Sequence, residues 1–411
     1  MSTERLKWID SRKESLLDTL MQLSAINSGT GNLSGLHDTQ SALHSLFSPL
    51  ADEVEIDDSV SVERTDHLGI TADQHYGKII SFSKRKTAPF QILLCGHMDT
   101  VFPKEHSFQS PEKVDEHILK GPGVADMKGG ILVMLTALEA FESSPGNDAI
   151  GWKVILSSDE ETGSLGSSAV LESAAKRSHV GMIYEPALAD GTLAGARKGS
   201  GNFTLVAHGK SAHAGREFSK GRNAIVALSA FINQIAALSN LEQDITVNVA
   251  RITGGTAVNV VPDLAVCQFN VRCPRPEKLL DIQHKLSTIV DAQNAKNDVR
   301  FTLSGGFTRP PKTISPGTQL LMDWTRECGE SLNTAVRFRD TGGCCDGNNL
   351  AAAGLPNVDT LGVCGANIHT DQEYMLIDSL TERAKLSYKL LGKIASHGDQ
   401  LIELSSAGRA S

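Results

Sequence analysis

The sequence predicts an α/β fold in which a sheet domain is interrupted by a smaller inserted domain. Apolar runs typical of buried strands alternate with helical stretches as far as about residue 190. The order then becomes βαββαβ, the ferredoxin-like split βαβ sandwich, and the α/β pattern resumes at Pro310-Pro311. A chain of 411 residues is long enough for two to three domains. We therefore expect one domain over residues 1–197 plus 310–411 and an inserted domain over residues 198–309.

The individual elements follow from the spacing of apolar residues. Ser11-Arg12-Lys13-Glu14 has the pattern of a capping box and precedes leucines at helical spacing, so we expect a helix to begin there. Buried strands are expected at 91–95, 152–157 and 180–185, and helices at 130–141, 164–176, 317–328, 346–353 and 377–396. In the inserted domain, strands are expected at 201–208, 244–252, 263–272 and 299–304, and helices at 221–239 and 277–294.

Composition and charge exclude several classes of protein. The 39 Lys and Arg against 48 Asp and Glu give a net charge of −9, which argues against a broad nucleic-acid surface. No apolar run reaches the ~18 residues that a membrane-spanning helix needs, and the charged N-terminus has no secretory signal pattern. The 7 cysteines are odd in number and form no CxxC pair, so we expect neither a disulfide framework nor a cysteine zinc site. The cysteine pattern favours a protein of the reducing cytoplasm.

Histidines and carboxylates follow the ends of the expected strands. His97 and Asp99 come directly after the strand at 91–95, and residues two apart in an extended segment share a face. Asp99 is therefore placed to hold the second ring nitrogen of a metal-bound His97. Asp126 lies in a glycine-rich turn before an apolar helix, where it could bridge two cations or cap the helix.

Three further segments carry the same chemistry. Asp159, Glu160 and Glu161 follow the strand at 152–157, where a cation or a helix N-terminus would offset their repulsion. Of two neighbouring glutamates, one could bind metal and the other move protons. Glu185 ends the strand at 180–185, and His369 follows a glycine-rich apolar run.

Each segment alone is a common surface feature, but together they indicate a metal centre. Two histidines and three carboxylates at strand ends suit a pair of divalent ions with mixed nitrogen and oxygen ligands. Zinc fits that ligand set best, and cobalt or manganese remain alternatives.

The segments GHMDT, GPGVADMKGG, DEETGS, EP and His369 occur in the order and spacing of a known family. From about residue 90 to its end, the chain resembles the co-catalytic zinc carboxypeptidase and aminoacylase family. That family includes glutamate carboxypeptidase, acetylornithine deacetylase and succinyl-diaminopimelate desuccinylase. The resemblance is strongest to the glutamate carboxypeptidases, and it implies a zinc-peptidase-like catalytic sheet domain with an inserted dimerisation or lid domain.

The resemblance implies a role for each residue of the metal centre. His97 and Glu185 would bind one ion, Glu161 and His369 the other, and Asp126 would bridge both. Glu160 would be the general base and Asp99 would orient His97. The peptide after the bridging aspartate, Asp126-Met127, would be cis.

The resemblance also extends to the inserted domain and to substrate binding. His213 would reach the active site of the partner subunit in a homodimer, which makes it a catalytic residue supplied across the interface. Asn259 and Arg272 match positions that hold the substrate carboxylate, and weaker matches for the same task are Arg309, Thr341, Gly342 and Gly343. Arg197 and Lys198 are further cations available to an anionic substrate. Cys344 and Cys345 depart from the small hydroxyl residues of the relatives, which leaves the substrate open.

The expected function is hydrolysis of an amide bond by two metal ions. The protein would release a C-terminal amino acid, with glutamate as one candidate, from an N-acylated or peptidic substrate. A close alternative is an N-acyl-amino-acid deacylase of the acetylornithine deacetylase type. A second alternative is a catalytically inactive binding protein, against which the complete ligand set argues. A third is a metal-dependent aminopeptidase, and the inserted domain argues against it.

Overall fold

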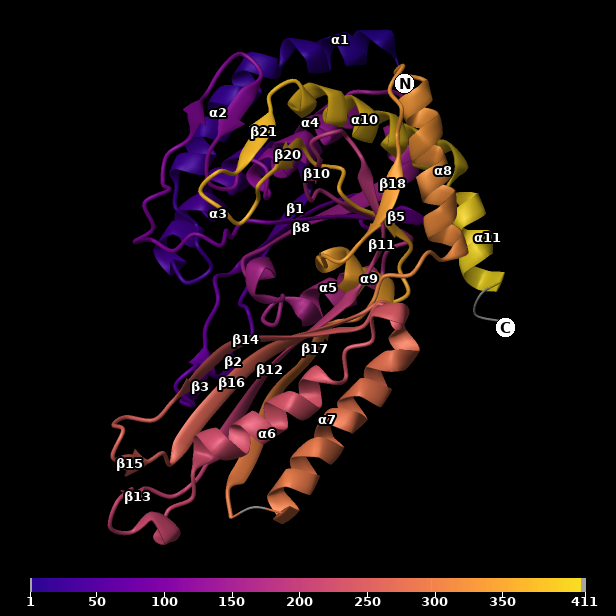
Figure 1. Ribbon diagram of the computed structural model, residues 1–411. Coiled ribbons are helices and arrows are strands. Elements are labelled where there is room, and N and C mark those ends of the chain that lie inside the picture. Colours follow the sequence, from indigo (N-terminus) through magenta and orange to yellow (C-terminus); the bar gives the residue numbers. More distant parts are fainter. Residues whose placement is uncertain (1, 297, 408–411) are drawn as a thin grey trace.

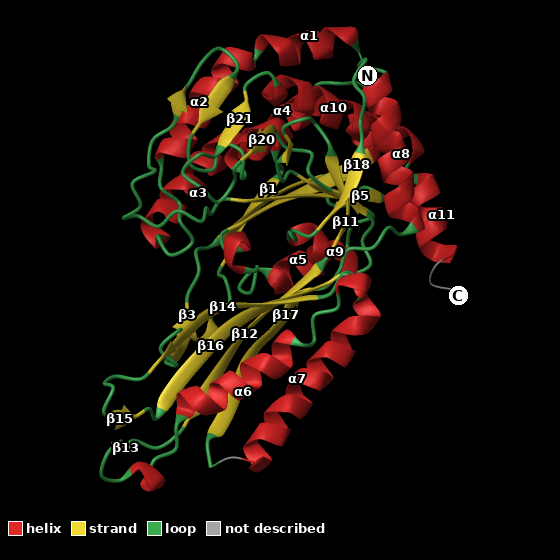
Figure 2. Cartoon of the chain, in the orientation of Figure 1, coloured by secondary structure: helices red, strands yellow, loops and turns green. Residues whose placement is uncertain are grey.

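The computed structural model describes residues 2–296 and 298–407 and consists of two layered parts (Figures 1 and 2). The larger part has a central sheet between helices, and the smaller part is a long sheet with two helices on one face. This mixed α/β architecture is the fold class that the sequence predicts.

The central sheet has the strand order β1-β4-β8-β5-β9-β19. Its parallel strands are β5 (Phe90–His97), β8 (Ile150–Ser157), β9 (Val180–Ile183) and β19 (Asn357–Val358). Strand β4 (Ile79–Lys84) pairs antiparallel with β8, and β1 (Glu53–Asp57) pairs antiparallel with β4. Because parallel strands are buried on both faces, β5, β8 and β9 are nearly continuous apolar runs, which made these three predictable.

Helices cover both faces of this sheet. The larger core lies under α1 (Thr3–Ser11), α2 (Lys13–Ala25), α3 (Leu33–Phe47), α4 (Lys128–Glu142), α8 (Pro316–Glu330), α10 (Ser379–His397) and α11 (Asp399–Ala407). The core on the opposite face lies under α5 (Ser168–Ala175) and α9 (Asp346–Ala352). Short 3₁₀ turns are η1 (Ser48–Leu50), η2 (Asn147–Ala149), η3 (Glu160–Thr162), η4 (Phe218–Lys220) and η5 (Leu241–Gln243).

Helix α4 packs closely against its neighbours because its first turn contains two glycines. A Cβ atom on Gly130 would lie 2.0 Å from the carbonyl oxygen of Tyr184, and one on Gly129 would lie 2.3 Å from the carbonyl oxygen of Val124. No side chain fits at these distances, so only glycine permits this approach. The turn that carries Asp126 is thereby held beside the ends of the parallel strands.

Two smaller sheets complete the larger part. One has the order β10-β20-β21-β7-β6, with β10 (Ala187–Leu188), β20 (Cys364–Ala366), β21 (Tyr374–Leu376), β7 (Ile118–Lys120) and β6 (Glu112–Lys113). The other pairs β11 (Leu193–Arg197) with β18 (Phe338–Thr341) in parallel. Strand β20 leads directly into the turn that carries His369.

Residues 199–309 form the four-stranded antiparallel sheet of the smaller part, in the order β14-β16-β12-β17. Its elements are β12 (Gly199–His208), α6 (Ala224–Ala236), β14 (Thr246–Gly254), β16 (Leu264–Cys273), α7 (Pro276–Lys296) and β17 (Arg300–Arg309). This is the expected βαββαβ order. Both helices pack on one face over a separate apolar core. A short ribbon of β13 (Ala212–His213) and β15 (Val260–Val261) lies at the end of this sheet far from the central sheet (Figure 1).

The opposite face of the inserted sheet is partly covered by the β2–β3 hairpin, with β2 (Val62–Thr65) and β3 (Thr71–Gln74). The Thr204 hydroxyl donates to the carbonyl oxygen of Thr65 at 3.3 Å, and the Ser304 hydroxyl donates to Thr65 Oγ1 at 3.1 Å. The Thr253 hydroxyl also donates to the carbonyl oxygen of His67. The hairpin therefore joins the smaller part to a segment that precedes it in the chain by more than a hundred residues.

One local prediction was wrong. Ser11 does not cap a following helix; it is the last residue of α1, and its hydroxyl donates to the carbonyl oxygen of Trp8 at 2.7 Å. Helix α2 begins at Lys13 after Arg12, whose side chain makes no capping hydrogen bond. The capping pattern was misread because α1 ends at Ser11, the residue with which the pattern begins.

Among the described helices, none is both long and apolar enough to span a membrane.

A candidate metal centre at the ends of the parallel strands

Five potential ligands converge from five separate segments. His97 is the last residue of β5, Glu161 lies in η3 after β8, and Glu185 follows β9. Asp126 lies in the turn before α4, and His369 follows β20. The carboxyl ends of neighbouring parallel strands meet at one sheet edge, which brings these segments together.

Asp126 faces two different histidines with its two carboxylate oxygens. Its Oδ1 atom lies 3.1 Å from His97 Nε2, and its Oδ2 atom lies 3.2 Å from His369 Nε2. Glu185 Oε1 lies 3.9 Å from His97 Nε2, whereas Glu161 Oε2 lies 3.1 Å from His369 Nε2. The cluster thus divides into two histidine–glutamate pairs with Asp126 between them.

Asp99 holds both His97 and the acidic turn. Its carboxylate lies 3.4 Å from His97 Nδ1, and its backbone carbonyl oxygen lies 2.9 Å from the same nitrogen. It also accepts the backbone N–H groups of Glu160 and Glu161 at 3.1 and 3.2 Å, and the Thr30 hydroxyl at 2.7 Å. With no exposed surface, Asp99 fixes the position of these neighbours relative to one another.

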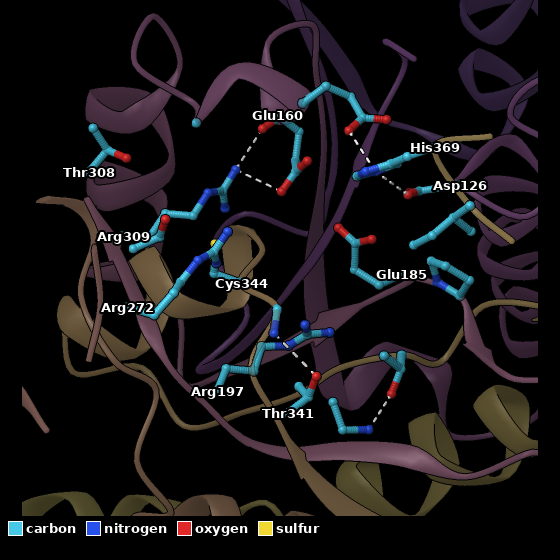
Figure 3. A pocket seen from close by; sticks show the side chains of 18 of the residues that line it. Asp126, Glu160, Glu185, Arg197, Arg272, Thr308, Arg309, Thr341, Cys344 and His369 are labelled. Carbon is cyan, nitrogen blue, oxygen red and sulfur yellow. Dashed lines mark hydrogen bonds and ion pairs between the residues drawn. The ribbon is translucent and has the colours of Figure 1, made fainter. Parts of the chain in front are cut away.

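Glu160 lies beside the cluster and is paired with an arginine. Arg309 Nη2 lies 2.7 Å from Glu160 Oε1, while Glu160 Oε2 lies 4.0 Å from His97 Nε2 (Figure 3). Burial raises the pKa of Glu160 to about 7, although Arg309 acts in the opposite direction. A carboxyl group with a pKa near neutrality suits a residue that both accepts and returns a proton.

The electrostatics of the cluster demand positive charge. Burial raises the pKa of Glu161 to about 8 and that of Glu185 well above its usual range, with further contributions from neighbouring carboxylates. Hydrogen bonds to Asp126 and Glu161 raise the pKa of His369 to about 11. The pKa of His97 is also raised, because its carboxylate neighbours outweigh burial. Positive charge, from protonated histidines or from bound cations, would offset the repulsion among these buried carboxylates.

These residues fit divalent ions. Two ligand atoms ~2.0–2.2 Å from a tetrahedral ion lie roughly 3.4 Å apart. The histidine–carboxylate separations of 3.1–3.9 Å within the two pairs bracket that value. Potential ligand atoms of His97, Glu160 and Glu185, and likewise those of His97, Asp126 and Glu161, lie within 4.8 Å of one another. The peptide Asp126-Met127 is cis, as expected.

The structure reveals buried carboxylates that the sequence did not single out. Glu373, with 1% of its surface exposed, accepts the backbone N–H groups of Gly123, Ala125 and Asp126 at 3.2, 3.0 and 3.0 Å. Asp346 pairs with Arg309 at 3.3 Å. The only sequence signal for Glu373 was its place four residues after His369 in the same loop.

A pocket of 510 Å³ opens beside the cluster. Of the residues expected to bind substrate, Arg272, Arg309, Thr341 and Gly343 line it, together with Cys344. The carbonyl oxygen of Gly342 accepts from Arg272 Nη1 at 3.4 Å. In Figure 3 Asp126, Glu185 and His369 lie on one side of this pocket and Arg272 and Arg309 on the other, while Glu160 is joined to Arg309.

Several cations and cysteines singled out from the sequence already contact other residues of the chain. Arg197 makes two hydrogen bonds of 2.9 Å with Asp359, and Lys198 pairs with Asp244. Cys344 Sγ lies 3.2 Å from Arg272 Nη1, whereas Cys345 is buried and its Sγ accepts the backbone N–H of Gly347 at 3.3 Å. The two cysteines therefore have different surroundings, one in the pocket wall and one at the start of α9.

His213 and Asn259 lie away from this cluster. His213 ends β13 and Asn259 directly precedes β15, and the backbone N–H of Ala214 donates to the carbonyl oxygen of Asn259 at 2.9 Å. His213 is exposed, and its Nδ1 atom accepts the backbone N–H groups of Gly215 and Arg216 at 3.1 and 3.2 Å. Within one chain the two residues are neighbours, but they do not line the pocket.

Residues 93–393 match Peptidase family M20/M25/M40. The chain belongs to this family. It is 27% identical over 387 residues to carboxypeptidase G2 of Pseudomonas sp. (strain RS-16), with 92% of this chain and 88% of that protein covered. It is 26% identical over 353 residues to succinyl-diaminopimelate desuccinylase of Hahella chejuensis (strain KCTC 2396), covering 80% and 88%. This M20 protein is therefore a metallohydrolase, and it is similar to proteins named as a carboxypeptidase and a desuccinylase.

The fold is also shared with solved structures. The crystal structure of a tripeptidase from Staphylococcus aureus subsp. aureus Mu50 superposes with a TM-score of 0.73 at 23% identity, covering 94% of this M20 chain and 99% of that chain. Because nearly the whole of both chains is covered, the shared fold includes most of the inserted segment.

Proposed function

We propose that this M20 protein is a dinuclear amidohydrolase that releases a C-terminal amino acid from an N-acylated or peptidic substrate. The observation that carries the proposal is the position of Asp126, whose two oxygens face two separate histidine–glutamate pairs. His97 and Glu185 would hold one ion and His369 and Glu161 the other. Zinc suits these ligands best, and cobalt or manganese are alternatives.

When bound, a pair of divalent ions supplies an acidified water and polarises the amide carbonyl. Glu160 accepts a proton from the attacking water and returns it to the leaving nitrogen as the carbon–nitrogen bond breaks. Its place between His97, 4.0 Å from one carboxylate oxygen, and Arg309, 2.7 Å from the other, supports this role. Asp99 keeps the base and the ligand Glu161 in position through their backbone N–H groups.

We further propose that the protein acts as a homodimer with residues 198–309 as an inserted dimerisation and lid domain and residues 1–197 plus 310–411 as the catalytic domain. Three exposed apolar side chains of the inserted domain support an interface there. They are Val226 on α6, Ile252 on β14 and Val258 near the β13–β15 ribbon. In that dimer His213 would stabilise the oxyanion in the partner's site, and Asn259 would help hold the substrate carboxylate. Arg272, Thr341 and the Gly342-Gly343 turn would complete carboxylate binding from the same chain.

Two candidate functions differ in which side of the scissile amide bond the protein recognises. The relative named carboxypeptidase G2 supports release of a C-terminal amino acid, for which glutamate is our candidate. The relative named as a desuccinylase supports an N-acyl-amino-acid deacylase as the second candidate. A cytoplasmic location is part of the proposal, and the free state of all seven cysteines supports it.

Assays on protein reconstituted separately with zinc, cobalt and manganese would test this function. N-acyl glutamates, including folate-like ones, should be compared with N-acetyl amino acids, among them N-acetylornithine, and with unblocked tripeptides. Hydrolysis of the acyl glutamates supports the carboxypeptidase, and preference for N-acetyl amino acids supports the deacylase. Cleavage of the tripeptides alone would contradict both.

A further inference from the structure

The pocket contains more positive charge than the proposed chemistry uses. Four carboxylates line it, Asp126, Glu160, Glu161 and Glu185, against five arginines, Arg64, Arg197, Arg272, Arg309 and Arg339. Two arginines are neutralised inside the protein, since Arg309 pairs with Glu160 and Asp346 and Arg197 pairs with Asp359. The carboxylates of the cluster would be neutralised by the divalent ions.

Three arginines are left facing the pocket. Arg64, Arg272 and Arg339 form no ion pair with any carboxylate in the part of the chain that the structure describes. Arg272 is half-buried and oriented by its neighbours, because its Nε donates to Asn270 Oδ1 at 2.9 Å. It is the one expected to hold a substrate carboxylate, so Arg64 and Arg339 are without an assigned task.

Arg64 reaches the pocket from the β2–β3 hairpin. The hydrogen bonds of Thr65 to Thr204 and Ser304 fix the backbone next to Arg64 on the inserted sheet. Asn202, which also lines the pocket, lies on the same face of that sheet as Thr204, because residues two apart in a strand share a face. The hairpin therefore adds a cation to the face of the inserted sheet that carries Arg272.

Arg339 reaches the pocket from β18. It pairs with Ala194 in the parallel β11–β18 register, and Thr341, two residues later, lines the same pocket. Like Arg64 it is exposed, so its charge is available to a bound molecule.

We propose that Arg64 and Arg339 are specificity-determining residues that select an amide substrate with an acidic group in addition to the carboxylate held by Arg272. The preferred substrate is then an N-acyl amino acid or peptide with at least two carboxylates. This inference rests on the proposed function for the identity of the scissile bond, but the charge requirement concerns binding alone. A guanidinium binds a carboxylate through two parallel N–H donors, which a neutral amide of the same size does not match.

Two matched pairs of compounds test the proposal. N-acetyl-L-glutamate against N-acetyl-L-glutamine places the additional charge on the amino-acid side, and N-succinyl-L-alanine against N-butanoyl-L-alanine places it on the acyl side. We expect the acidic member of at least one pair to be favoured by about tenfold or more in kcat/KM, mainly through KM. The double variant Arg64→Gln/Arg339→Gln should abolish that preference, and the single variants should apportion it.

Two controls separate charge from disruption. Arg64→Lys keeps the positive charge but loses the two parallel donors, so it should keep more of the preference than Arg64→Gln and less than the wild type. Arg300→Gln removes an exposed arginine at the first position of β17, which pairs with His208. That position is at the opposite end of the strand from Arg309 and the pocket, so the preference should be unchanged.

Binding measurements keep this inference separate from the proposed function. Calorimetric titration of the metal-reconstituted Glu160→Gln protein with the same four compounds reports affinity without turnover. If the wild-type protein hydrolyses none of the four compounds, that result counts against the proposed function. Tighter binding of the acidic members that is lost in the double variant would still support the charge selection. Equal affinity for acid and neutral members, or a preference that survives in the double variant, overturns it.

Discussion

Arg309, the last residue of β17, contacts Glu160 with its Nη2 atom 2.7 Å from Glu160 Oε1, so the inserted sheet ends on the expected general base. Arg309 also donates to the backbone carbonyl oxygen of Glu160 at 2.8 Å. A cation at this distance favours the ionised carboxylate, which is the form that accepts a proton.

Removing the charge of Arg309 should therefore shift the pH profile. In Arg309→Gln the pKa of Glu160 rises, and the acidic limb of kcat against pH moves to higher pH. Arg309→Lys should shift it less. If the variant instead raises KM with an unchanged pH profile, Arg309 binds substrate and does not position the base.

Glu160→Gln should retain both metal ions and lose hydrolysis by ~10² or more, the scale of general-base removal. Elemental analysis of wild type and variant should give about two divalent ions per chain. Near-normal turnover in the variant would remove Glu160 from the mechanism, and a consistent single ion would leave Asp126 as a simple ligand.

Glu373→Gln should weaken metal binding by about 10–100-fold, the usual scale for residues that orient ligands. The substitution replaces a carboxylate oxygen that accepts N–H groups of the Asp126 turn by an amide nitrogen that cannot accept them. Competition with a chelator of known affinity measures the change. Asp371→Asn, an exposed substitution two residues away, is the matched control and should have no effect.

The stability of the metal-free protein should fall as pH rises from about 5 to 8. Glutamate in an unfolded chain has a pKa near 4.5, whereas burial raises the pKa of Glu161 to about 8 in the folded state. Between these values the folded state binds more protons than the unfolded state, so ionisation destabilises the fold. Thermal unfolding of chelated wild type and Glu161→Gln should show a shallower slope in the variant. Identical slopes would contradict the assignment, and adding metal should flatten the wild-type curve.

His213→Ala should abolish most activity in a homodimer. Mixed dimers with Glu160→Gln subunits should regain activity, because one site would then combine an intact Glu160 with the partner's His213. Gel filtration and co-expression with two affinity tags provide the species to assay. Failure of the mixed dimers to recover activity would place His213 outside the partner's site.

Strands β5, β8 and β9 of the central sheet and the metal segments could be predicted because their signals are local, whereas β1, β4 and β19 were not expected from the sequence. Buried parallel strands are apolar runs, and the ligands follow those runs directly. The β2–β3 hairpin could not be predicted, because every residue of β3 is exposed and the position of β2 depends on hydroxyl groups of Thr204 and Ser304 far along the chain. Arg64 was missed for the same reason. Glu373 was missed because its partners are backbone N–H groups, which leave no trace in residue types.

The β2–β3 hairpin also limits how the molecule can be recombined. A chimaera that exchanged only residues 199–309 with a relative would separate Thr204, Thr253 and Ser304 from the acceptors that now receive their hydroxyl protons. It would also strip a covering loop from Val206 and Val266, whose side chains pack beside Gly69. A transplant that respects these contacts has to carry the segment around residues 62–74 along with the sheet.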